Sequence, residues 1–210
     1  MIPAFQTYLF DVDGTLVDSA ADICGAIQGV LAGTAQNAVP FEFLKGYIGR
    51  HLVDLFEDLF PDYTSEQVNA LVEEYRRAYP LRGHAATKAY PQAAETLAKL
   101  GGRKATATTK GTPTTRVVLE RFGLLPYFDH VQGTDGFPAK PSPDVIFKAL
   151  AGLGARREDC LFIGDSCADM EAAKRAGVKV CAVTYGYGKR EELAAWAPDY
   201  WLDELSELAG

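Results

Sequence analysis

Short apolar runs recur along the chain at wide intervals, and the later ones alternate with segments whose apolar residues repeat at helical spacing. Helical patterns cover residues 112–122, 142–153 and 169–176, and Gly177 stands where the last of these helices is expected to end. Strands that alternate with helices form βαβ units, so the pattern predicts an α/β fold with a mainly parallel sheet flanked by helices. The strand-like runs are residues 8–10, 104–108, 130–132, 160–163 and 178–183.

Residues 16–84 break this alternation, because helix follows helix there with no convincing strand between. Ser19 is placed to cap one helix, and Thr64 with Gln67 fits a capping box ahead of another apolar stripe. The strand–helix alternation then resumes. We therefore predict a helical insertion within a core domain, with the insertion at 16–84 and the core at 1–15 and 85–210.

Two carboxylates, Asp11 and Asp13, directly follow the first apolar run. Ligands bind beyond the carboxyl ends of strands in open α/β sheets, so these acids are expected at a binding edge. Extended residues two apart point the same way, and Gly14 allows the chain to bend there. One acid could then attack as a nucleophile while the other transfers protons. Taken alone, the pair also fits an exposed turn.

Two later loops carry groups that suit an anion. Thr108 and Thr109 end a strand-like run ahead of a helix, where hydroxyl and backbone N–H groups bind anions, although the same residues fit a simple helix start. Lys140 stands beside two prolines that stiffen its backbone, and a fixed lysine neutralises phosphate or developing negative charge. A solvated lysine before a helix is the alternative.

Asp165 and Asp169 follow the apolar run at 160–163 and lie four residues apart. If Asp169 lies in a first helical turn, both carboxylates face the strand end, and hard oxygen ligands of this kind suit Mg²⁺. Acids favoured by the helix dipole are the simpler explanation. Arg50 lies in the insertion, where it would either meet a second anionic group of a substrate or remain solvated.

The composition excludes several classes of protein. The 210 residues are 48% hydrophobic and 23% charged, as in soluble globular proteins, and the net charge of −7 argues against a nucleic-acid binder. No apolar stretch reaches membrane-spanning length and no signal peptide is evident, so no membrane association is expected. The four cysteines include no C-x-x-C pair, which favours free thiols in the cytoplasm over a zinc site.

Together the motifs resemble those of the haloacid dehalogenase superfamily of phosphohydrolases, most closely its phosphoglycolate phosphatase-like branch. The match covers nearly the whole chain and keeps the family's order of motifs. It implies a Rossmann-like core, and the insertion corresponds to the family's small α-helical cap of the C1 type. The motifs are D-x-D-G-T-L-V-D-S at 11–19, a strand ending at Thr108, K-P-S-P-D at 140–144 and G-D-S-x-x-D at 164–169.

The resemblance implies a Mg²⁺-dependent phosphomonoester hydrolase that forms an aspartyl-phosphate. Asp11 is then the nucleophile and Asp13 the acid and base, with Lys140 neutralising charge. Mg²⁺ is held by the Asp11 carboxylate, the Asp13 backbone carbonyl and Asp165. The resemblance also implies that Asp169 orients Lys140 or metal-bound water. The residues expected to contact phosphate or substrate are Thr108, Thr109, Lys140 and Arg50.

The expected substrate is a small phosphate ester such as phosphoglycolate, and the protein is expected to be a monomer or homodimer. A phosphomutase of the β-phosphoglucomutase type and a pyrophosphatase are the alternatives. Asp13 argues against a dehalogenase, because dehalogenases of this superfamily lack the second acid. At Thr109 the chain departs from many relatives, which carry Asn there, so the side chain offers a hydroxyl donor but no amide.

Overall fold

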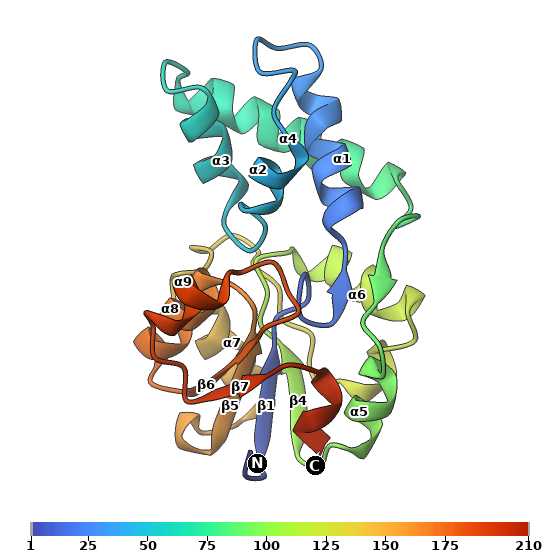
Figure 1. Ribbon diagram of the computed structural model, residues 1–210, viewed down its shortest axis with the longest axis vertical. Coiled ribbons are helices and arrows are strands. Elements are labelled where there is room, and N and C mark those ends of the chain that lie inside the picture. Colours follow the sequence, from blue (N-terminus) through green and yellow to red (C-terminus); the bar gives the residue numbers. More distant parts are fainter. Residues whose placement is uncertain (1, 210) are drawn as a thin grey trace.

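The computed structural model describes residues 2–209, so Met1 and Gly210, at the outer ends of the predicted core ranges, lie outside the described residues. Its main sheet has the strand order β4-β1-β5-β6-β7 and is parallel throughout. The predicted α/β fold with a parallel sheet is therefore confirmed (Figure 1). The strands are β1 (Thr7–Phe10), β4 (Arg103–Thr106), β5 (Cys160–Gly164), β6 (Lys179–Val183) and β7 (Tyr200–Leu202).

Both faces of the central strands are buried, which is why β5 and the part of β1 after Thr7 are apolar. Side chains alternate between the faces, so Phe10 packs in one core and its neighbour Leu9 in the other. Helices cover both faces of the sheet (Figure 1). They are α5 (Ala93–Lys99), α6 (Thr112–Arg121), α7 (Asp144–Leu153), α8 (Cys167–Ala176) and α9 (Arg190–Ala194), with 3₁₀ turns at Leu125–Tyr127, Arg157–Asp159 and Leu205–Ala209.

The strand predicted at 130–132 is not formed. Only an isolated bridge joins His130 to Ala105, just before β4 ends. Beyond it the hydroxyl of Thr106 replaces a backbone partner, donating to the Gln132 carbonyl at 3.0 Å and accepting from its N–H at 2.9 Å. Backbone bonds with Lys104 and Thr106 thus hold residues 129–130, and beyond them the Thr106 side chain holds Gln132 beside the sheet.

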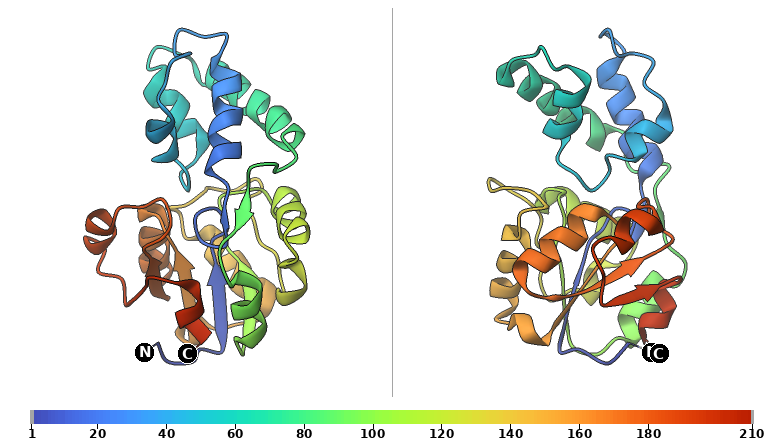
Figure 2. Two further views of the ribbon diagram at one scale, coloured as in Figure 1. Left: turned by 45° about the vertical axis from the view of Figure 1, so that its right-hand side comes forward. Right: turned by 60° about the vertical axis from the view of Figure 1, so that its left-hand side comes forward.

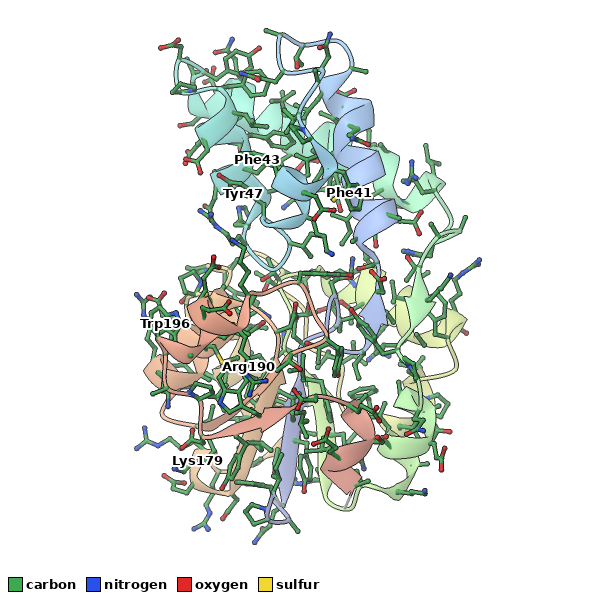
Figure 3. The ribbon with its side chains drawn as sticks, in the orientation of Figure 1. Phe41, Phe43, Tyr47, Lys179, Arg190 and Trp196 are labelled. Carbon is green, nitrogen blue, oxygen red and sulfur yellow. The ribbon has the colours of Figure 1, made fainter. Side chains whose placement is uncertain are left out.

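The helices expected in the insertion are α1 (Ala20–Leu31), α2 (Phe41–Lys45), α3 (Leu52–Leu59) and α4 (Ser65–Leu81). They share a separate apolar cluster, which includes Ile27, Leu55 and Val72. Figures 1 and 2 show them as a group beyond one end of the sheet, opposite the termini, and Figure 3 places Tyr47 on this group. The capping box of Thr64 and Gln67 is formed as predicted.

Two chain segments connect the helical group with the sheet, and they lie side by side. Strand β2 (Val17–Asp18) leads out and pairs antiparallel with β3 (Lys88–Ala89), which leads back. The buried carboxylate of Asp22 ties the same region together. It accepts hydrogen bonds from Arg82 Nε at 3.3 Å, from the Ala86 N–H at 3.0 Å and from the Thr87 hydroxyl at 2.7 Å.

Among residues 2–209, no helix combines the length and apolar character needed to cross a membrane.

Candidate active site

Three predicted site residues follow three neighbouring strands of the sheet. Asp11 comes directly after β1, Thr108 lies two residues beyond β4, and Asp165 comes directly after β5. Two backbone bonds continue the pairing beyond the strand ends, from Asp11 N–H to the Ile163 carbonyl at 2.9 Å and from Ala107 N–H to the Phe10 carbonyl at 2.8 Å. The parallel sheet therefore brings the motifs to one edge, facing the helical group.

Lys140 is the fixed cation of this edge. Its side chain is fully buried, and its Nζ lies 2.9 Å from Asp11 Oδ1 and also contacts Asp169 Oδ1. It donates a further bond of 3.2 Å to the Ala107 carbonyl. Burial lowers the pKa of Lys140, but the two carboxylates outweigh that effect and raise it. The ammonium is therefore held charged against Asp11.

Asp169 has both oxygens engaged. It forms a reciprocal capping box with Ser166 at the start of α8, and its Oδ2 also accepts from the Asp165 N–H at 3.2 Å. Its other oxygen contacts Lys140. The helix start thus fixes a carboxylate in contact with the lysine.

Asp11, Asp165 and Asp169 form a buried cluster whose oxygens lie within 4.8 Å of one another. Asp165 is oriented by the Thr15 hydroxyl at 3.1 Å and the Tyr187 N–H at 2.8 Å. Burial raises the pKa of Asp11 to about 6, in spite of Lys140, and burial together with the other two acids raises that of Asp165. Three buried acids beside one lysine leave an excess of negative charge, and such an oxygen donor set fits a divalent cation.

Gly14 is required for this arrangement. It has a positive φ of 84°, and a side chain at this position would collide with the Asp165 carboxylate. The turn between Asp11 and the helical group can therefore pass close to Asp165 only because the residue is glycine.

Asp13 lies in different surroundings from Asp11. Its Oδ1 accepts from the Ser19 hydroxyl at 2.5 Å, and its Oδ2 lies 3.2 Å from Lys110 Nζ. Its carboxylate is not part of the three-acid cluster described above. The two acids of the first motif are thus held by separate partners.

Sequence reasoning missed two of these partners. Ser19 precedes α1, but its hydroxyl bonds Asp13 and does not cap the helix. Lys110 follows Thr108 and Thr109 in the same loop, and this position next to a candidate anion site was the signal available in the sequence.

The two threonines differ in their contacts. Thr108 is buried, its hydroxyl accepts from the Lys110 N–H at 3.3 Å, and its carbonyl accepts from the Thr134 hydroxyl at 2.9 Å. The Thr109 hydroxyl donates to the Gly49 carbonyl at 3.1 Å, in the loop before α3. The loop after β4 is therefore joined to the helical insertion at Thr109.

A cavity of about 480 Å³ lies between the sheet edge and the helical insertion. Asp11, Asp13 and Arg50 line it. Arg50 stacks on the Tyr47 ring at 4.5 Å and lies 3.7 Å from Asp54, with its side chain 45% exposed. Other lining residues, from the sheet edge and the insertion, include Thr108, Thr109, Lys110, Ile23, Leu55 and Tyr75.

The family model of the haloacid dehalogenase-like hydrolases matches residues 8–183. The chain belongs to this family. It is 36% identical to the phosphoglycolate phosphatase of Aquifex aeolicus, over 97% of this chain and 94% of that protein. It is 34% identical to the pyrophosphatase PpaX of Anoxybacillus flavithermus, with the same coverage of both chains.

The solved structure of a predicted phosphatase from Clostridium acetobutylicum superposes with a TM-score of 0.91 at 29% identity, over 99% of this chain and 97% of that one. Family and relatives together show a phosphatase of the haloacid dehalogenase-like family.

Proposed function

We propose that this phosphatase is a Mg²⁺-dependent phosphomonoesterase that acts on a small phosphorylated metabolite, phosphoglycolate or a similar ester, through an aspartyl-phosphate on Asp11. The observation that carries the proposal is the separate placement of the two acids. Asp11 is held 2.9 Å from the buried Lys140 ammonium, whereas Asp13 lies beside the same cavity with partners of its own. A nucleophile and an acid–base need such different surroundings.

In the proposed reaction an Asp11 oxygen attacks phosphorus and the bond to the ester oxygen breaks. Asp13 gives its proton to the departing alkoxide, which leaves as the alcohol. Asp13 then takes a proton from water as the water attacks phosphorus, and the bond to Asp11 breaks. Phosphate leaves, Asp11 is a carboxylate again and Asp13 again carries a proton. Phosphoryl transfer depends mostly on positioning and charge stabilisation, which Lys140 and the sheet edge supply.

Thr108 and the backbone around Thr109 are proposed to bind the phosphoryl oxygens. The Thr109 hydroxyl has another partner in Gly49, which supports a contact through its backbone N–H. Arg50 lines the cavity on the side of the insertion and is proposed to face the rest of the substrate.

The Asp11 carboxylate, the Asp13 backbone carbonyl and Asp165 are proposed to hold Mg²⁺, with Asp169 orienting Lys140. The excess negative charge of the buried acids supports a divalent cation at this position. When bound, Mg²⁺ supplies positive charge that stabilises the phosphoryl oxygens.

Residues 16–84 are proposed to act as a cap that closes over the site and excludes water from it. The contact between Thr109 and Gly49 and the shared cavity support this role. The cap would then select the substrate, because it contributes the wall opposite Asp11.

The test is hydrolysis of p-nitrophenyl phosphate with Mg²⁺ by wild type and by Asp11→Asn. The variant should show no turnover above background, while Asp62→Asn, in an exposed loop of the insertion, should match wild type. Comparable activity of Asp11→Asn and wild type would contradict the assigned nucleophile.

The similarity to PpaX supports a second candidate, hydrolysis of pyrophosphate. Measuring kcat/KM over a panel that includes phosphoglycolate, pyrophosphate and sugar phosphates separates the candidates. A clear preference for pyrophosphate would replace the metabolite ester as the substrate.

A further inference from the structure

Lys110 connects the core with the helical insertion at the proposed acid–base. Its Nζ lies 3.2 Å from Asp13 Oδ2 and donates a bond of 3.0 Å to the hydroxyl of Tyr79 on α4. The same ammonium lies 4.4 Å from the centre of the Tyr79 ring. With a side chain only 7% exposed, Lys110 is enclosed between these two residues.

Both ends of Lys110 are held. Its N–H donates to the Thr108 hydroxyl, and its carbonyl accepts from the Thr134 N–H at 3.1 Å, which fixes the backbone. Tyr79 is itself buried and stacks on Tyr75, with ring centroids 5.4 Å apart. The ammonium therefore has a defined place relative to α4 and to Asp13.

The two acids of the first motif are held by different partners. Asp11 is held by Lys140, which belongs to the core. Asp13 is held by the Ser19 hydroxyl, next to the start of α1, and by Lys110, which rests on α4 through Tyr79. The proposed nucleophile is thus held by a core lysine, whereas the lysine that holds the proposed acid–base is itself braced by the insertion.

We propose that Lys110, braced by Tyr79, is a positioning residue that aims the Asp13 carboxyl group at the oxygen of the leaving group. This inference rests on the proposed function, because it needs Asp13 to protonate that oxygen. It goes further in making proton delivery depend on the contact between α4 and the loop after β4.

Esters with different leaving groups distinguish this positioning role of Lys110 from a role in structure or in phosphate binding. A p-nitrophenolate departs with little need of a proton, whereas an alkoxide needs one as the bond breaks, so a misplaced Asp13 harms alkyl esters more. Phenyl and ethyl phosphate complete a series without a second charged group, which removes any effect of Lys110 on a substrate anion. Values of kcat/KM report the step in which the leaving group departs.

We expect Lys110→Met to lower kcat/KM for ethyl phosphate about 10- to 100-fold more than for p-nitrophenyl phosphate, a part of the full effect of acid catalysis. Lys110→Arg should recover most of this difference. Tyr79→Phe, which keeps the ring and removes only the hydroxyl partner, should show the same selectivity to a smaller extent. Lys148→Met is the matched control, since Lys148 lies 4.8 Å from the Phe137 ring, on α7.

A double-mutant cycle makes the test sharper. With Asp13→Asn in place, Lys110→Met should no longer discriminate between ethyl and p-nitrophenyl phosphate, because no acid remains to be aimed. Discrimination that persists in that background would overturn the proposal.

Equal losses on all three esters would also overturn it and would assign Lys110 to structure or phosphate binding. If Lys110→Met does not fold, Tyr79→Phe carries the same test, and its equal loss on all esters is equally decisive. A wild type that hydrolyses none of the esters would overturn the proposed function itself, whereas a uniform loss in an active enzyme overturns only the positioning role.

Discussion

The hydroxyl of Thr109 donates a 3.1 Å hydrogen bond to the backbone carbonyl of Gly49, across the boundary between the sheet edge and the helical insertion. Gly49 has a positive φ of 93°, and a β-carbon there would lie 3.0 Å from Ser166. The loop before α3 therefore approaches two separate motifs of the core. Thr109 takes part in this contact through its side chain.

Thr109→Val should weaken binding of substrate while leaving chemistry nearly unchanged. The variant keeps the shape but loses one neutral hydrogen bond that supports the proposed closure of the cap, so KM should rise about 3- to 10-fold. Steady-state kinetics with p-nitrophenyl phosphate give the two constants separately. Thr109→Ser, which keeps the hydroxyl, should behave like wild type, and an unchanged KM in Thr109→Val would show that the contact does not favour closure.

Asp13→Asn should lower kcat/KM for alkyl phosphates by about 10²- to 10⁴-fold, the usual contribution of a positioned proton donor. The backbone carbonyl is unaffected, so Mg²⁺ should still raise the Tm of this variant. Enzyme kinetics and thermal unfolding measure the two effects. Hydrolysis of ethyl phosphate at the wild-type rate would remove Asp13 from the proton transfers.

In Asp165→Asn, Mg²⁺ should no longer raise the Tm. At a concentration about 100 times its Kd, a bound ion raises the Tm of a chain this long by about 5–10 °C. The variant should lose this rise and have an equal or higher Tm without the ion, because one of three buried acids is gone. Differential scanning fluorimetry with Asp203→Asn, an exposed acid, as the control measures both effects. The same rise in Asp165→Asn would place the ion elsewhere.

His84 should make the protein less stable in mild acid. It is buried, its Nδ1 has no partner within residues 2–209, and it meets the Tyr79 ring edge-on at 5.3 Å. Burial lowers the pKa of His84, with Lys110 and Arg121 acting in the same direction and Asp22 and Asp13 opposing them.

The unfolded chain therefore takes up a proton at His84 before the folded protein does. The free energy of unfolding should therefore fall as the pH drops below 6.5. The fall should stop once the pH is below the lowered pKa of His84 in the folded state. Urea unfolding at pH 7.5 and 5.5 measures the change. Asparagine tolerates the positive φ of 53° at position 84. The free energy of unfolding of His84→Asn should therefore differ less between the two pH values than that of wild type. An equal difference would assign the acid sensitivity to other groups.

The sequence predicted the parallel sheet because short apolar runs recur along the chain and the later ones alternate with helical patterns. It missed β7 (Tyr200–Leu202), a short edge strand with two half-buried residues, whose pattern does not stand out from a loop. It also placed a strand at 130–132, where the Thr106 hydroxyl supplies bonds that a neighbouring strand would otherwise supply.

The same contrast holds at the site. Asp11, Thr108 and Asp165 could be placed together because each follows a strand. Their strands are neighbours in the sheet, which brings the three residues to one edge. Lys110 and Ser19 could not be assigned, because their contacts with Asp13 depend on how the loops after β1 and β4 fold and not on the strand pattern. Local patterns predict what a strand end presents, but they do not predict which side chains two irregular loops bring together.

Asp22 and the short β2–β3 pair join the outgoing and returning segments at one place, as Figure 2 shows for the two connections. Because the two connecting segments are joined to each other, they act as one hinge. The helical insertion then has little freedom to twist or translate relative to the sheet. Any swing of the helices then follows an arc about that hinge, and the loop at Gly49 travels farther along it than Ser19, which lies beside the hinge. Small rotations there would open the cavity widely while moving the chain around Asp13 only slightly.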